Sequence, residues 1–196
     1  MKILYIDDIP TPDRLDIHRQ LSFDSDDVYR VVFCASEEPG RSWELDLSGL
    51  NYEILKGVQF RPPGQVNPFS FKFNPGIVAV LRAYQPDVVV LSGYVHPTMW
   101  LAAAWCRRNS VPYGITSESS RDTTSNGYLK GLLKKSVLGP VIKGASFGLP
   151  VSRAAGAHLR ELAGNNILPI YQFPNTPDID AIQAVIDAST KSIQDR

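Results

Sequence analysis

The fold class follows from residues 74–117, which read NPGIVAVLRAYQPDVVVLSGYVHPTMWLAAAWCRRNSVPYGITS. Asn74 followed by proline is typical of a helix start, and apolar residues at helical spacing come after it. Short apolar runs at 87–91 and 112–116 flank a second helical segment, for which Thr98 is the expected N-cap. Helices that alternate with short apolar runs predict parallel strands with helices packed on the faces of the sheet.

Apolar runs of the same kind occur along the rest of the chain. The first, residues 2–6, ends at Asp7-Asp8, and its lack of alternation predicts a central strand that is buried on both faces. Further runs lie at 29–35, 52–55, 146–151 and 167–173, and helical patterns lie at 126–142, at 153–162 after the expected cap Ser152, and at 178–190. We therefore expect one α/β domain, a Rossmann-like parallel sheet flanked by helices, over residues 1–185, and the start of a linker or tail over 186–196.

Residues 36–73 are less regular than the rest of the chain. They contain many aromatic side chains, namely Trp43, Phe60, Phe69, Phe71 and Phe73. This composition is too aromatic for a solvated linker, so we expect the segment to pack on the domain or to line a cleft.

The composition limits the possible function classes. The chain has 196 residues, 43% hydrophobic and 20% charged, which is typical of a globular protein. Twenty basic side chains balance twenty acidic ones, so we do not expect a nucleic-acid-binding protein. Cys34 and Cys106 lie in apolar runs, which favours neither a disulfide nor a zinc site. No apolar run suits a signal peptide or a membrane span, so we expect a cytoplasmic protein.

One segment has an unbalanced charge. Residues 119–160 carry seven basic side chains and a single acidic one, Asp122. Lys130, Lys134 and Lys135 lie along one side of the helix expected there. Such a face is either simply solvated or rests on anionic lipid headgroups at the inner face of the membrane, and the sequence leaves both possibilities open.

Common nucleotide and metal motifs are missing. The sequence contains neither G-x-G-x-x-G nor G-x4-G-K-[ST], and we expect no cofactor and no metal ion. Asp7-Asp8 after a first strand also occurs in response-regulator receiver domains, which need an Asp after the third strand and a Lys after the fifth. Lys56 and Ser117 follow those strands here, which excludes a receiver domain. A capping role for the two acids stays open.

Candidate site residues follow from the sheet. Ligands of parallel sheets bind beyond the carboxyl ends of the strands. The loops expected there carry Asp8, Arg14, Tyr94, His96, Ser117, Glu118, Ser119 and Asn175. A carboxylate flanked by hydroxyls, as in Ser117-Glu118-Ser119, suits the recognition of sugar hydroxyls. Helix capping by Ser119 and turn capping by His96 are the structural alternatives.

Several short motifs occur in an order that is typical of one enzyme family. They are Gly93-Tyr94-x-His96-Pro97, Trp100-x4-Trp105, Ser117-Glu118-Ser119, Lys130-x3-Lys134 and Phe173-Pro174-Asn175-x2-Asp178. On these residues the chain resembles the N-terminal half of a group 1 (family 4) glycosyltransferase, over residues 1–185. Such enzymes have the GT-B fold, two facing Rossmann-like domains with the active site between them. The chain departs from the family where Ser117-Glu118 replaces a His-Gly pair, where the first loop lacks glycines, and in having no Glu-x7-Glu motif.

The resemblance implies that a sugar is transferred from a nucleotide-sugar to an acceptor hydroxyl with retention of configuration and without a metal, as in polysaccharide biosynthesis. The donor would bind mainly through a C-terminal half that this sequence lacks, so the chain alone would be inactive, and the acceptor would be a glycan or a lipid-linked molecule. The implied reacting-centre residues are Glu118, Ser117 and His96, and the implied acceptor-binding residues are Asp8, Arg14, Tyr94, Ser119, Lys130 and Asn175. The alternative is a non-catalytic module, such as a split-enzyme subunit, that binds a carbohydrate or a partner.

Overall fold

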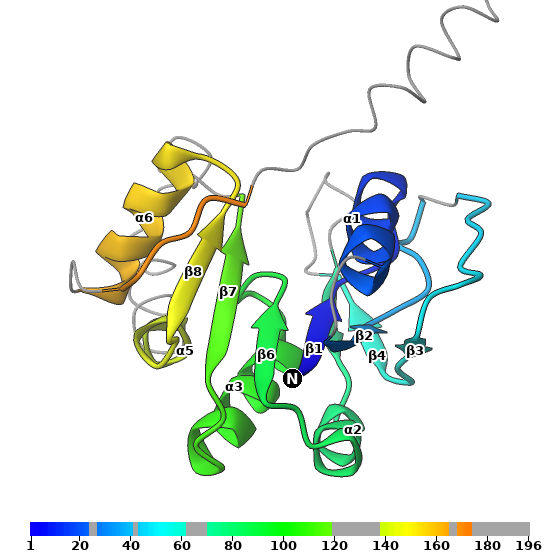
Figure 1. Cartoon of the computed structure of the whole chain (residues 1–196), viewed down its shortest axis with the longest axis horizontal. Coiled ribbons are helices and arrows are strands. Elements are labelled where there is room, and N and C mark those ends of the chain that lie inside the picture. The colour runs from blue at the N-terminus through cyan, green and yellow to red at the C-terminus, as the bar shows by residue number, and fades with distance from the viewer. Residues whose placement is uncertain (24–26, 41–42, 62–69, 119–137, 165–167, 174–196) are drawn as a thin grey trace, which may run out of the picture.

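The computed structural model describes residues 1–23, 27–40, 43–61, 70–118, 138–164 and 168–173 (Figure 1). Its centre is a six-stranded parallel sheet in the order β3-β2-β1-β6-β7-β8. The strands are β1 (Lys2–Asp7), β2 (Val28–Phe33), β3 (Tyr52–Ile54), β6 (Val88–Leu91), β7 (Tyr113–Ser117) and β8 (Phe147–Pro150). β1 pairs with β2 on one side and with β6 on the other, so the prediction of a central first strand is confirmed.

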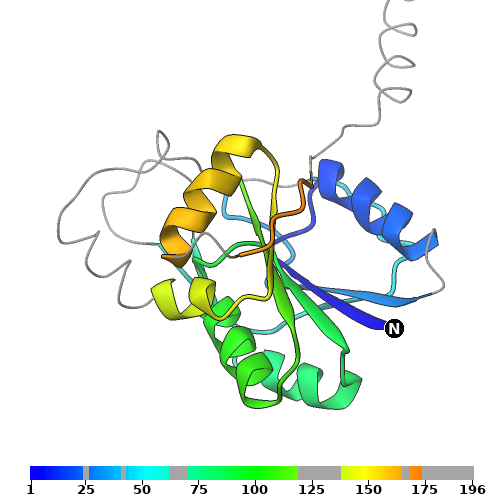
Figure 2. The same ribbon diagram turned by 60° about the vertical axis from the view of Figure 1, so that its left-hand side comes forward.

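Helices cover both faces of this sheet, as Figure 2 shows. They are α1 (Pro12–Phe23), α2 (Ile77–Tyr84), α3 (Pro97–Arg108), α5 (Gly139–Lys143) and α6 (Arg153–Ala163). α1 packs on one face, and α2 and α3 pack on the other (Figure 2). The predicted α/β class, a Rossmann-like parallel sheet flanked by helices, is therefore confirmed.

β1 is buried on both faces because successive side chains of a strand point to opposite sides of the sheet. Tyr5 packs with Leu15 of α1 in one core, whereas Leu4 and Ile6 pack in the other core with inward residues of α2, α3 and α5. Polar side chains would be costly on either side. This explains why the first apolar run does not alternate with polar residues.

The residues expected to cap α2 and α3, Asn74 and Thr98, are buried and bond to each other, so those two predictions are wrong. The Thr98 hydroxyl accepts the Asn74 backbone N–H at 3.0 Å and lies 2.8 Å from Asn74 Oδ1. The Asn74 side-chain amide donates to the backbone oxygen of Cys34 at 2.9 Å. The observed N-caps are Gly76 and His96.

Other predictions of local structure have mixed outcomes. Ser152 caps α6, as predicted, because its hydroxyl accepts the backbone N–H of Ala155 at 3.2 Å. The apolar run at 167–173 was expected to form a strand, and its described part lies along β8: Tyr171 and Phe173 donate their backbone N–H groups to the oxygens of Gly148 and Pro150. Only Ile170 forms a bridge, with Gly148, because Pro150 and Pro169 have no N–H to complete the neighbouring pairs. α1 is a helix that the apolar pattern did not predict. Of the helix predicted at 126–142, residues 126–137 lie outside the described residues, and α5 covers most of the remainder. The predicted helix at 178–190 and the boundary at residue 185 also lie outside the described residues.

The aromatic segment 36–73 includes β3 of the main sheet and an antiparallel hairpin of β4 (Val58–Phe60) and β5 (Phe71–Phe73). Its described part packs on the domain through Leu50, Leu55 and Lys72, which are buried, whereas the aromatic rings of Trp43, Phe60 and Phe73 are exposed. The rings of Phe60 and Phe71 stack with centroids 5.2 Å apart. Cys34 and Cys106 are free and buried, and burial raises the pKa of the Cys106 thiol to about 12. None of the helices in the described ranges is both long enough and apolar enough to cross a membrane.

Candidate functional site

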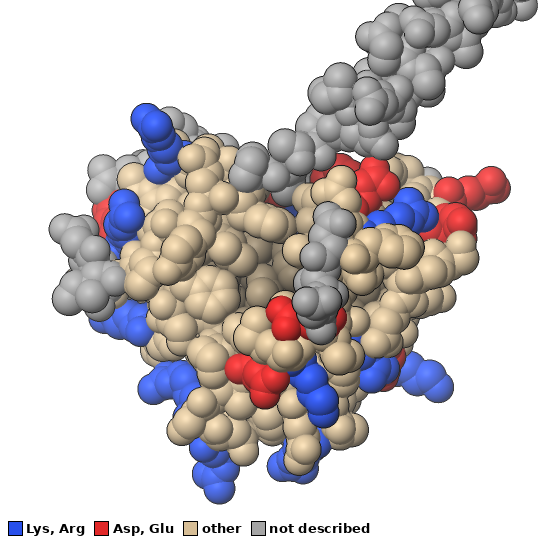
Figure 3. Space-filling view, viewed as in Figure 1, with Lys and Arg blue, Asp and Glu red and all other residues tan. Residues whose placement is uncertain are grey.

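The loops after β1, β6 and β7 line a cavity of about 680 Å³ at the carboxyl edge of the sheet. This is where a ligand of a parallel sheet is expected. Trp43, from the aromatic segment, also lines it, which agrees with the predicted role of that segment. Figure 3 shows Asp and Glu side chains gathered on the side of the molecule that carries β1 and α1, and mainly Lys and Arg on the side of α5 and α6.

Asp7 anchors the first of these loops from inside the protein. It ends β1, its side chain is 1% exposed, and its Oδ1 accepts the backbone N–H of Asp8 at 2.7 Å. Its Oδ2 lies 3.0 Å from Nε2 of His18 on α1, and Nδ1 of His18 lies 2.6 Å from the Tyr29 hydroxyl. Burial alone would raise the pKa of Asp7, but the Arg14 guanidinium and the hydrogen bond from His18 outweigh it and lower the pKa to about 2. Asp7 is therefore a buried carboxylate that is charged and holds the start of the loop after β1 through its hydrogen bond with the Asp8 N–H.

Arg14, on the first turn of α1, joins this carboxylate to the mouth of the cavity. Its Nη1 lies 3.4 Å from Asp7 Oδ1, and its Nη2 donates to Glu118 Oε1 at 2.7 Å. Burial lowers the pKa of Arg14, but the carboxylates of Asp7 and Glu118 raise it by a larger amount, so the net shift is upward. The Glu118 side chain is 55% exposed. The structure thus places together Arg14 and Glu118, which are 104 residues apart in the sequence.

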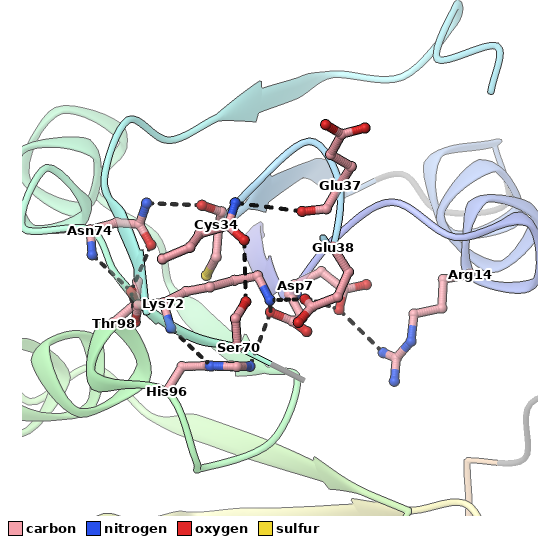
Figure 4. A network of polar contacts seen from close by, with 12 residues as sticks. Asp7, Arg14, Cys34, Glu37, Glu38, Ser70, Lys72, Asn74, His96 and Thr98 are labelled. Atoms are coloured by element: carbon pink, nitrogen blue, oxygen red, sulfur yellow. Dashed lines mark hydrogen bonds and ion pairs between the residues drawn. The ribbon is translucent and has the colours of Figure 1, made fainter. Parts of the chain in front are cut away.

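A second polar cluster surrounds Asp8, the next residue of the same loop. Its Oδ1 lies 3.0 Å from Nε2 of His96, in the loop after β6, and 2.8 Å from Nζ of Lys72 on β5. Lys72 Nζ also contacts Glu38 Oε2 at 2.5 Å, and Figure 4 shows the Lys72 side chain extending past His96 toward Glu38. Burial raises the pKa of Asp8, but the hydrogen bond from His96 and the charge of Lys72 outweigh it, and the net shift is downward.

Ser117 supplies a hydroxyl at the end of β7. It is 5% exposed and lines the cavity, and its Oγ has no hydrogen-bond partner among the residues that the structure describes. A buried hydroxyl without a partner is costly, so a ligand that bonds to it would recover that cost. Tyr94 also lines the cavity, but its side chain packs in the hydrophobic core.

Six of the nine predicted site residues therefore lie around one cavity: Asp8, Arg14, Tyr94, His96, Ser117 and Glu118. Ser119, Lys130 and Asn175 lie outside the described residues. Sequence reasoning missed Lys72 and His18, which contact the cavity residues Asp8 and Asp7, and Glu38, which contacts Lys72. In the described part of the chain, no three His, Cys, Asp or Glu side chains are arranged to hold a metal ion.

Comparison with solved structures supports the fold assignment. The structure of UDP-N-acetylglucosamine 2-epimerase from Rickettsia bellii matches with a TM-score of 0.51 and 14% identity, over 100% of this chain and 49% of that one. The co-structure of S. aureus MnaA with UDP matches with a TM-score of 0.54 and 15% identity, over 87% of this chain and 44% of that one. The chain has the fold of one GT-B half. GT-B is the fold that UDP-N-acetylglucosamine 2-epimerases share with glycosyltransferases.

The chain thus spans about half the length of these structures. At such low identity the likeness shows the fold and nothing finer. No family model matches the sequence. A search of the curated proteins gives no match either.

Proposed function

We propose that the chain is the acceptor-side half of a GT-B enzyme that transfers a sugar from a nucleotide-sugar to an acceptor hydroxyl with retention of configuration. Three observations support this proposal. They are the GT-B half fold, the order of motifs that resembles a group 1 glycosyltransferase, and the polar cavity at the carboxyl edge of the sheet. In this proposal Glu118, Ser117 and His96 contact the reacting groups.

The charge of the cavity carries the proposal. Four carboxylates line it, those of Asp7, Asp8, Asp13 and Glu118, and Arg14 is the one Lys or Arg among its described lining residues. A nucleotide diphosphate would meet net repulsion there, whereas a sugar hydroxyl can donate to a carboxylate and accept from Ser117 or Arg14. This half therefore suits the hydroxyl-bearing acceptor, and the diphosphate is assigned to the other half, which would stabilise it as the leaving group.

A binding experiment on the 196-residue chain tests this assignment. Saturation-transfer NMR would compare methyl glucoside and N-acetylglucosamine with UDP and UDP-N-acetylglucosamine. We expect transfer to the protons of the neutral saccharides, weakened in Ser117→Ala and Glu118→Gln. Glu44→Gln is the matched control, because Glu44 is exposed and does not line the cavity.

The outcomes separate the alternatives. Transfer to uridine protons without transfer to the neutral saccharides would contradict the acceptor-side assignment, and so would the absence of any transfer. Saccharide binding with no turnover when the chain is combined with its donor-binding half would favour the non-catalytic module. Conversion of UDP-N-acetylglucosamine by the combined halves without any acceptor would favour epimerisation, the activity named for the similar Rickettsia bellii protein.

A further inference from the structure

The β4–β5 hairpin contributes a buried lysine to the back of the cavity. Lys72 is the middle residue of β5 and is fully buried, although it lies between two phenylalanines. Side chains alternate along a strand, so Phe71 and Phe73 face the other way, and Phe73 is exposed. A buried ammonium is costly unless charged partners compensate it. Its presence here therefore needs an explanation in its contacts.

Lys72 contacts both members of the Asp8–His96 pair. Its ammonium lies 2.8 Å from Asp8 Oδ1 and contacts Glu38 Oε2, and its backbone N–H donates to Nδ1 of His96 at 3.3 Å. One residue thus bonds to the carboxylate through its side chain and to the imidazole through its backbone. Figure 4 shows these contacts converging between β5 and the loop that carries His96.

These contacts define the proton position on His96. A nitrogen that accepts the Lys72 N–H cannot carry a proton, so the imidazole proton is on Nε2. Nε2 faces Asp8 Oδ1 at 3.0 Å, and an ionised carboxylate can only accept. His96 is therefore the Nε2–H tautomer. The Asp8 oxygen that accepts this proton also forms an ion pair with the ammonium of Lys72.

The backbone of β5 is itself held in place on the side away from the cavity. The hydroxyl of Thr98 on α3 lies 2.9 Å from the backbone oxygen of Lys72, and it also accepts the backbone N–H of Asn74. Thr98 and Asn74 are both buried. The N–H that meets His96 is thus fixed by buried hydrogen bonds to α3, the same helix that His96 caps.

We propose that Lys72 is a positioning residue, which holds Asp8 as a carboxylate and His96 as the Nε2–H tautomer so that the pair meets the acceptor hydroxyl in a single protonation state. The inference rests on the proposed function, because it concerns the same cavity and the same acceptor hydroxyl. Asp8, from the loop after β1, and Lys72, from β5, contact His96, and Glu38, from the loop after β2, contacts the ammonium of Lys72. Without the ammonium, two carboxylates would remain near an imidazole with no cation between them.

The test measures the protonation of the two His96 ring nitrogens directly, by ¹⁵N NMR of the full chain without ligand. The His96 signals are assigned by their loss in His96→Gln. In the wild type we expect a protonated Nε2 and an unprotonated Nδ1 at neutral pH. In Lys72→Met, Asp8 and Glu38 lose the cation between them and attract a second proton. We expect His96 to take up this proton on Nδ1, which would break the hydrogen bond from the backbone N–H of residue 72.

Two further variants separate positioning from a general structural effect. Adding Glu38→Gln to Lys72→Met removes one carboxylate, and we expect it to return His96 toward the neutral tautomer. Lys56→Met is the matched control, since Lys56 is an exposed lysine of the same segment, and it should leave the His96 signals unchanged. If Lys72→Met does not fold, the wild-type spectrum still decides, because a proton on Nδ1 would overturn the proposal.

Saccharide binding distinguishes failure of this inference from failure of the proposed function. We expect Lys72→Met to weaken saccharide binding by about tenfold, the loss typical of one charged contact, with partial recovery in the double variant. Binding that is unchanged in Lys72→Met, in a protein whose His96 signals are also unchanged, would overturn the positioning role alone. The predicted tautomer in a chain that binds no saccharide would support the positioning role and overturn the proposed function.

Discussion

Asp7→Asn should make the stability of the protein less dependent on pH in the acid range. Asp7 is 1% exposed and contacts Arg14, His18 and the backbone N–H of Asp8. Together these contacts lower its pKa from the usual 3.8 to about 2. At about 1.4 kcal/mol per pKa unit, the charged form contributes about 2 kcal/mol to the free energy of unfolding. Asparagine keeps the shape of the side chain and removes this contribution.

The pH window follows from the direction of the shift. The folded-state pKa is lower than the unfolded-state value, so the stabilisation is fully present above about pH 4 and is lost as the pH falls through about 2. At neutral pH the wild type should therefore be more stable than Asp7→Asn by about 2 kcal/mol. The difference should shrink toward zero near pH 2. A domain of this size has an unfolding free energy of roughly 5–15 kcal/mol, so the variant should remain folded at neutral pH.

Urea unfolding followed by far-UV circular dichroism, at several pH values between 7 and 2, measures this difference. Other carboxylates also titrate in this range, so the informative quantity is the wild-type free energy minus that of Asp7→Asn at each pH. Asp16→Asn is the matched control, because Asp16 forms an exposed pair with Arg19 on the same helix. A wild-type advantage that stays constant down to pH 2 would refute the reasoning, since it would show that the charge of Asp7 is not what stabilises the fold.

Three further predictions concern the hydrogen bonds of Thr98 that hold β5, the Glu118 side chain at the cavity, and the lysines of residues 119–160. Thr98→Val should lower the free energy of unfolding by about 1–3 kcal/mol, because it leaves the buried Asn74 N–H without a partner. Urea unfolding measures this difference, and a loss below about 0.5 kcal/mol would contradict the prediction. Glu118→Gln should lower turnover of the combined halves by about 10–1000-fold at an unchanged melting temperature, whereas this chain alone should show no turnover. Replacing Lys130, Lys134 and Lys135 by Gln should abolish low-salt co-sedimentation with anionic vesicles, and a wild type that never sediments would show that these lysines are only solvated.

The strands were predictable from the sequence because their environment is uniform. A parallel strand inside an α/β domain has apolar neighbours on both faces, so its sequence is a short continuous apolar run, as in residues 2–6 and 87–91. The site residues at strand ends were predictable for a related reason. Loops at the carboxyl edge of a parallel sheet converge, so Asp8, His96 and Ser117 could be grouped before their contacts were known.

α1 escaped prediction because its inner face is polar where it meets the site. Only Leu15 and His18 are buried on this helix, and Arg14 lies between the buried Asp7 and the cavity. The apolar residues of this segment are Leu15, Ile17, Leu21 and Phe23, and only Ile17 and Leu21 are separated by the three or four residues that a helical pattern requires. Pro12 at the first position and Asp13 in the first turn were the remaining signals of a helix start.

Lys72 was hidden for a different reason, because the local pattern predicts the opposite orientation. In Phe71-Lys72-Phe73, alternation would place the phenylalanines inside and the lysine in water. The structure reverses this, since the inner side of the hairpin faces the carboxylates of Asp8 and Glu38, which a lysine can neutralise and a phenylalanine cannot. Those carboxylates lie 64 and 34 residues away in the sequence, so no local pattern can reveal them. A strand that buries its charged residue and exposes a large apolar one is therefore a signal of a polar site behind it, and it can be read only after the fold has placed the partners.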